Sequence, residues 1–152
     1  MMPYVMKIVA GVISTVGFAV IFRLKPSHWF FAGVDGLVAC LSYFAFSELI
    51  DNVFWPNALA AFLTAFCAEI FARICKAPST VFLLPGCIAL VPGGTLYYTM
   101  SNFISQNYSA SSENLLITVE VGVAIGGGII LASVLRLAIF TFIDRIKKPK
   151  RN

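Results

Sequence analysis

The sequence has few charged residues and a single histidine. Its 152 residues include 11 Lys or Arg and 7 Asp or Glu, or 12% charged, whereas a soluble domain usually has about 25%. Hydrophobic residues make up 59% of the chain, and its mean hydropathy is +0.89. Long uncharged runs separate the charges. The composition therefore predicts an integral membrane protein in contact with the lipid bilayer, with no nucleic-acid partner despite the net charge of +4.

The sequence also lacks the residue patterns of metal sites and membrane hydrolases. No C-x-x-C pair is present and His28 is the only histidine, so we expect no metal and no cofactor. Gly33-Val34-Asp35-Gly36 lacks the G-x-G-D order and the Tyr-Asp partner of an aspartyl membrane protease, which needs two close carboxylates. We expect no catalytic residue, and an intramembrane aspartyl hydrolase is the least favoured alternative. The cysteines are interpreted as small apolar residues, and they are Cys40, Cys67, Cys75 and Cys87.

Apolar segments occupy most of the chain. A helix of about 20 residues, rising about 1.5 Å per residue, matches a hydrocarbon core of about 30 Å. The sequence therefore predicts an all-α, polytopic membrane helix bundle in one domain over residues 1–143, with a basic tail over 144–152. The predicted transmembrane segments run over about 4–22, 29–47, 56–74, 80–104 and 115–135.

Basic and non-basic loops alternate along the chain. The first and third loops and the tail carry Lys or Arg, whereas the second and fourth loops carry acidic residues and no basic ones. Cytoplasmic loops of membrane proteins carry an excess of Lys and Arg. We therefore expect a bacterial inner (plasma) membrane protein with its N-terminus outside and its C-terminus in the cytoplasm. This alternation requires an odd number of crossings, so it favours a crossing over a re-entrant pair for the fourth segment.

The fourth segment is interrupted by two Pro-Gly pairs, and the second pair is followed by another glycine. Proline removes a backbone donor, and bare backbone groups in lipid cost several kcal/mol each, so such a break must face protein or a watery cavity. Discontinuous helices form binding sites in many transporters, and a half-helix starting near Thr95 would direct its positive end at a carboxylate. A kinked helix without a ligand is the alternative. The predicted substrate pathway consists of Pro85, Gly86, Pro92, Gly93, Gly94, Thr95 and Tyr97.

Three acidic residues lie within the apolar segments. Such residues are costly in a membrane and usually face the interior of the bundle, so Asp35 and Glu120 are candidates for proton or ion coupling. Glu69 is a weaker candidate, because an ion pair with Arg73, four residues later, explains it. Lys7 lies near the outer end of the first segment, where a lysine can extend to the membrane surface.

The fifth segment carries small residues at helical spacing. Residues of this kind, four apart, let two membrane helices approach closely. We therefore interpret them as a packing face, without assigning the partner helix to this chain, a copy of it or another protein. They are Gly122, Gly126, Gly127 and Gly128.

Several motifs together resemble the threonine/serine exporter family, in its smaller C-terminal module. They are Ala68-Glu69-Ile-Phe-Ala-Arg73, the run from Ala77-Pro78 to Pro85-Gly86, and Leu90-Val91-Pro92-Gly93-Gly94 followed by Tyr97. The resemblance extends from about Gly17 to Leu137. As a separate small module, the chain is similar to the small subunit of a two-component succinate exporter. It implies one subunit of a secondary exporter for a small carboxylate metabolite (threonine, serine or succinate), with a larger membrane subunit as partner. A homo-oligomer and a non-transporting membrane scaffold remain the alternatives.

Overall fold

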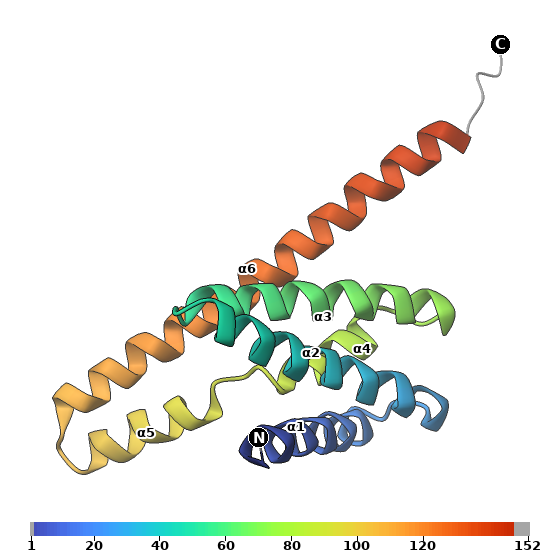
Figure 1. Cartoon of the computed structure of the whole chain (residues 1–152). Helices are drawn as coiled ribbons and strands as arrows, with labels where there is room; N and C mark the ends of the chain where they lie inside the picture. The colour runs from blue at the N-terminus through green and yellow to red at the C-terminus, as the bar shows by residue number, and fades with distance from the viewer. Residues whose placement is uncertain (1, 148–152) are drawn as a thin grey trace.

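The computed structural model describes the backbone of residues 2–147 and the side chains of residues 5–139, and Figure 1 shows helices joined by short connections, with no strand in that range. The predicted all-α bundle is therefore confirmed. The helices are α1 (Met2–Ile21), the short η1 (Pro26–His28), α2 (Trp29–Leu49), α3 (Phe54–Ile74), α4 (Thr80–Ile88), α5 (Gly93–Ile104) and α6 (Tyr108–Lys147).

Three helical stretches are long and apolar enough to cross a membrane, and they run over Pro26–Leu49, Phe54–Ile74 and Tyr108–Ile139. The pair α4 and α5 counts as a fourth candidate if the two helices form one bent span. Within the residues whose side chains are described, α1 contributes the apolar stretch Val5–Ile21, which is shorter than these helices. Five crossings thus stay a prediction, while three to four candidate spans are present in the described part of the chain.

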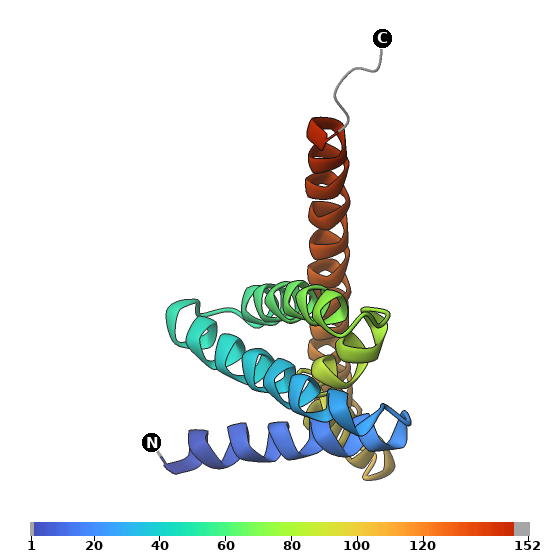
Figure 2. The ribbon, with the colours of Figure 1, turned by 90° about the vertical axis from the view of Figure 1, so that its right-hand side faces the viewer.

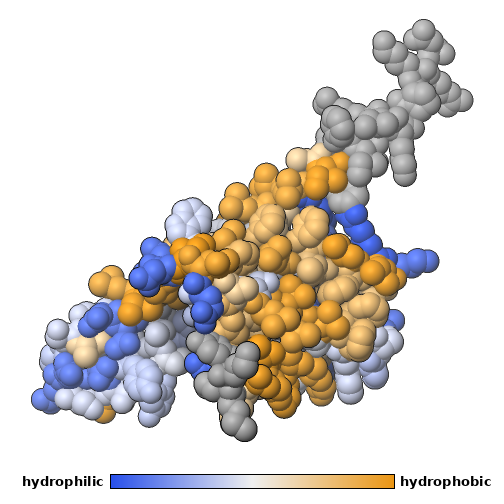
Figure 3. Space-filling view, in the orientation of Figure 1, coloured by the Kyte–Doolittle hydropathy of each residue, from blue (hydrophilic) through white to orange (hydrophobic). Residues whose placement is uncertain are grey.

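Helices α1, α2 and α3 lie in successive layers, and α6 crosses α3 obliquely (Figures 1 and 2). Helix α4 packs against α1, α2 and α3, while α5 folds back along the N-terminal half of α6. The C-terminal half of α6 projects beyond the other helices. Figure 3 shows an apolar surface over most of this face, with polar residues gathered around the turn between α5 and α6.

Helix α6 is longer than the predicted fifth segment. It has 40 residues, and the predicted segment, 115–135, forms its middle part. The chain beyond Leu135 continues this helix without a bend. The predicted basic tail begins inside the helix, which extends to Lys147, and its residues 148–152 lie outside the described range.

The fourth segment is broken once rather than twice. Helix α4 ends at Ile88 and α5 begins at Gly93, with a bend of 53° between their axes. Pro92 has a non-helical backbone (φ −77°, ψ 58°) and caps α5, and a residue that precedes proline is disfavoured in the helical region. The break expected at the first Pro-Gly pair is absent. Pro85 lies inside α4 and its side chain is fully buried.

Candidate functional site

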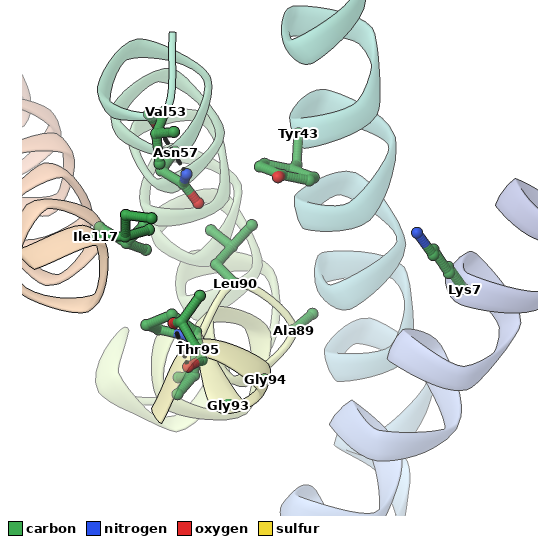
Figure 4. A pocket seen from close by; sticks show the side chains of 13 residues that line it. Lys7, Tyr43, Val53, Asn57, Ala89, Leu90, Gly93, Gly94, Thr95 and Ile117 are labelled. Atoms are coloured by element: carbon green, nitrogen blue, oxygen red, sulfur yellow. Dashed lines mark hydrogen bonds between the residues drawn. The ribbon is translucent and has the colours of Figure 1, made fainter. Parts of the chain in front are cut away.

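A cavity of about 790 Å³ lies at the break between α4 and α5 (Figure 4). Every long helix of the bundle contributes to its wall, and the 89–92 connection forms one side of it. The break predicted from the Pro-Gly pattern therefore borders an open space, as bare backbone groups in a membrane require. The lining residues used below are Lys7, Tyr43, Asn57, Gly93, Gly94 and Thr95.

The N-terminus of α5 is open to this cavity. The backbone N–H of Gly93 donates to the carbonyl of Val91, and helical hydrogen bonding resumes at Leu96. The N–H groups of Gly94 and Thr95 find no acceptor among the described residues, as expected in the first turn of a helix. Free N–H groups and the helix dipole together favour a negatively charged group at this end.

Two side-chain contacts hold α5 against α6. The hydroxyl oxygens of Thr95 and Thr118 are 2.9 Å apart, and the Thr95 hydroxyl donates to the carbonyl of Pro92 at 3.0 Å. One helical turn further on, the Ser111 hydroxyl donates to the carbonyl of Thr99 at 2.9 Å. These contacts hold the N-terminal part of α5 against α6, and Gly94 and Thr95 in its first turn line the cavity.

The cavity also contains polar side chains that the sequence patterns do not single out. Asn57, which is 4% exposed, donates from Nδ2 to the carbonyl of Val53 at 2.8 Å, and its amide oxygen has no partner among the described residues. Tyr43 extends from α2 on the opposite side (Figure 4). A single Asn near the start of an apolar helix was the available sequence signal for this site.

A buried carboxyl group lies deeper in the bundle. Asp35 on α2 is fully buried, and neither of its carboxyl oxygens has a hydrogen-bond partner within the described structure. Gly86 of α4 makes room for it, because a Cβ at that position would overlap Asp35 Oδ2 and lie 3.0 Å from Asp35 Cγ. The same Cβ would lie 3.1 Å from the Thr64 methyl group on α3. The glycine of the first Pro-Gly pair thus accommodates a side chain instead of breaking the helix.

One family model matches most of the chain. Residues 7–135 match the family model described as "Threonine/Serine exporter, ThrE". The chain belongs to the threonine/serine exporter family. No curated protein and no solved structure matches it. The membership supports a multi-pass membrane protein with a transport role, which agrees with the apolar helices described above.

The residues that the sequence grouped as one substrate pathway lie in different places in the structure. Gly93, Gly94 and Thr95 line the cavity together with Pro92. Pro85 and Gly86 lie in α4 beside Asp35, outside the cavity lining. Tyr97 is 67% exposed on α5, stacks edge-on with its neighbour Tyr98, and is not part of the lining either.

The three acidic residues of the apolar segments also have different surroundings. Asp35 lies inside the bundle, as an intramembrane acid is expected to do, whereas Glu120 is exposed on the surface of α6. Glu69 Oε2 forms an ion pair with Arg136 Nη1 of α6 at 3.3 Å. The local pattern had suggested Arg73 as the partner, so the structure adds an inter-helix contact that the sequence spacing did not predict.

Only one glycine of the predicted packing face contacts another helix of this chain. A Cβ on Gly128 would overlap the carbonyl oxygen of Ala58, so α6 and α3 approach each other closely there. A Cβ on Gly122, Gly126 or Gly127 would meet nothing within 4 Å. The predicted packing face therefore has one close contact within this chain, at Gly128, while its other three glycines have free space around them in the described structure.

Proposed function

We propose that this chain is one subunit of a two-component secondary exporter that moves a small carboxylate-bearing metabolite, threonine, serine or succinate, out of the cell. The observation that carries the proposal is the cavity at the helix break, into which the free N–H groups of Gly94 and Thr95 open. A carboxylate is common to all three solutes and is the group that such an N-terminus stabilises. Family membership supports transport as the activity.

We further propose that Asp35 couples transport to a proton or cation gradient. Burial of a charged carboxylate without a partner is costly, and a bound proton or cation removes that cost. Glu69 is a less suitable coupling residue because Arg136 already pairs with it.

The proposed partner is a larger membrane subunit of the same family. The C-terminal half of α6 projects with exposed apolar residues such as Ile130 and Val134, and Glu120 lies on the exposed side of the same helix. An acid facing lipid is costly, so contact with a partner explains the position of Glu120 better than lipid exposure does. The open Gly122 and Gly126 nearby would allow a partner helix to approach closely.

The orientation expected from the loop charges places the cavity in the outer half of the bacterial inner membrane. Tyr43 and Asn57 lie near the ends of α2 and α3 that meet at the acidic second loop, the side predicted to be outside. In this orientation α4 starts at the cytoplasmic side and Asp35 lies on the path between that side and the cavity. An outward-facing cavity is the arrangement that an exporter needs for releasing its solute.

The proposal is tested by efflux of preloaded labelled threonine, serine and succinate from cells with this chain alone and with the larger subunit. Gly94→Leu should abolish efflux by filling the cavity, without loss of protein from the membrane. Gly17→Leu is the matched control, because a Cβ there meets nothing within 4 Å and the residue is not part of the cavity lining. Normal efflux by Gly94→Leu would contradict the proposed site, and absence of efflux for all three solutes with both subunits present would contradict the function.

The coupling residue has its own test. Asp35→Asn keeps the shape of the side chain but cannot exchange a proton, so efflux should lose its dependence on the external pH. Glu120→Gln should keep that dependence, because Glu120 lies outside the bundle interior. An unchanged pH dependence in Asp35→Asn would remove this carboxyl group from the coupling mechanism.

A further inference from the structure

One face of α1 packs toward the interior of the bundle and leads to the cavity. Lys7, Gly11 and Thr15 are spaced four residues apart, so they lie on one side of the helix. Thr15 is fully buried, and a Cβ on Gly36 of α2 would overlap its side chain. A Cβ on Gly11 would overlap Cys40 Sγ and lie 3.7 Å from the Cβ of Ala89. This face therefore contacts α2 and the connection between α4 and α5.

Lys7 lies one turn before Gly11 on that inward face, and its side chain lines the cavity. Figure 4 shows it extending from α1 toward α2. The side chain of Lys7 is exposed as well as part of the lining, so it lies at the edge of the cavity and not in its interior.

The charge of Lys7 is not balanced within the cavity. It is the only charged residue among those that line the cavity, and no acidic residue lines it. Lys7 has no acidic partner among the residues whose side chains the structure describes. The first turn of α5 adds the free N–H groups of Gly94 and Thr95 to the lining of the same cavity, across α2 from Lys7 in the view of Figure 4. Ammonium and N–H groups all act as donors toward an anion.

We propose that Lys7 supplies the cationic group that binds the carboxylate of the exported solute in this cavity. The inference rests on the proposed export function and assigns a specificity-determining residue to it. The ammonium group neutralises the carboxylate, while the amide oxygen of Asn57 and the hydroxyl of Tyr43 are available to other polar groups of the solute. The solute is thus selected by its carboxylate and not only by its size.

The test compares each acid with its amide, because the amide keeps the size but lacks the negative charge. Efflux of threonine and threoninamide, serine and serinamide, and succinate and succinamide is measured with both subunits present. The variants are Lys7→Met, which removes the charge, and Lys7→Arg, which keeps it. Lys25→Met is the control, since Lys25 is exposed just before η1 and does not line the cavity.

Lys7→Met should raise KM for the acid by roughly tenfold to a hundredfold, the range expected for losing a hydrogen bond to a charged group. Its KM for the amide should change little, so the discrimination between acid and amide should largely disappear. Lys7→Arg should retain most of the discrimination, and Lys25→Met should retain all of it.

Two results would overturn the assignment while leaving the export function intact. If Lys7→Met keeps the discrimination between acid and amide, the lysine only contacts lipid headgroups. If Lys7→Met weakens efflux of acid and amide equally, the residue has only a structural role. If the unmodified pair of subunits exports none of the solutes, the proposed function itself fails and the assignment fails with it.

Discussion

The contact between Gly86 and Asp35 predicts that Gly86→Ala destabilises the protein when Asp35 is present but not when Asp35 is replaced by alanine. In Gly86→Ala the new methyl carbon would lie 3.0 Å from Asp35 Cγ, 3.1 Å from the Thr64 methyl group and in overlap with Asp35 Oδ2. Unbonded carbon atoms prefer separations of about 3.5–4.0 Å. Asp35 is fully buried and has little room to rotate away, so α4 must move from α2 and α3.

The expected cost follows from two opposing effects. Inserting a methyl group into a packed interior costs about 1–3 kcal/mol, and Ala gains up to about 1 kcal/mol over Gly inside a helix. Gly86→Ala should therefore lower the free energy of unfolding by up to about 2 kcal/mol. In the Asp35→Ala background the obstructing carboxyl group is gone, so the same change should be neutral or stabilising.

The assay is thermal unfolding of the purified chain in mild detergent for both single variants and the double variant. A change of 1 kcal/mol shifts Tm by roughly 2–4 °C in a chain of this size. Gly122→Ala is the matched control, because it is helical and open, and it should raise Tm slightly. A coupling energy below about 0.5 kcal/mol between the two positions would refute the proposed contact.

Two further contacts give predictions in the same assay. Gly128→Ala should lower the free energy of unfolding by about 1–3 kcal/mol, because its methyl group would overlap the backbone carbonyl of Ala58, which cannot rotate away. Gly127→Ala, the control, should be neutral or stabilising. Equal effects of the two substitutions would argue against the close approach of α6 to α3. Glu69→Gln and Arg136→Gln should each lower stability, and the double variant should lose less than their sum by roughly 1 kcal/mol. Additive losses would mean that this ion pair contributes nothing.

Local sequence rules predicted the features of this chain that depend on neighbouring residues. The composition predicted a helical membrane protein, and the break before α5 follows from Pro92 and the glycines after it, whose backbone preferences act within a few residues. The cost of an acid in lipid also led us to expect Asp35 and Glu120 inside the bundle; Asp35 is buried there, whereas Glu120 is exposed on α6. These inferences needed no knowledge of which helices are neighbours.

Features that depend on distant parts of the chain were not predictable from local rules. The spacing of Glu69 suggested Arg73, but the observed ion pair with Arg136 spans 67 residues and two helices. Pro85 has the same local character as Pro92, yet the tight packing of α4 keeps it inside a helix. A local pattern states what a segment prefers, whereas the neighbouring helices decide which preference is realised.

The packing of α4 also connects the two halves of the proposed mechanism. Gly86 touches the Asp35 carboxyl group, α4 ends two residues later at Ile88, and Ala89 and Leu90 already line the cavity. Gain or loss of a proton at Asp35 that displaces α4 at Gly86 would therefore also move Ala89, three residues later, which lines the cavity. A coupling residue anywhere on the outer surface of α6 would have no such short connection. For this reason Asp35 is the acidic residue whose ionisation is best placed to change the shape of the cavity.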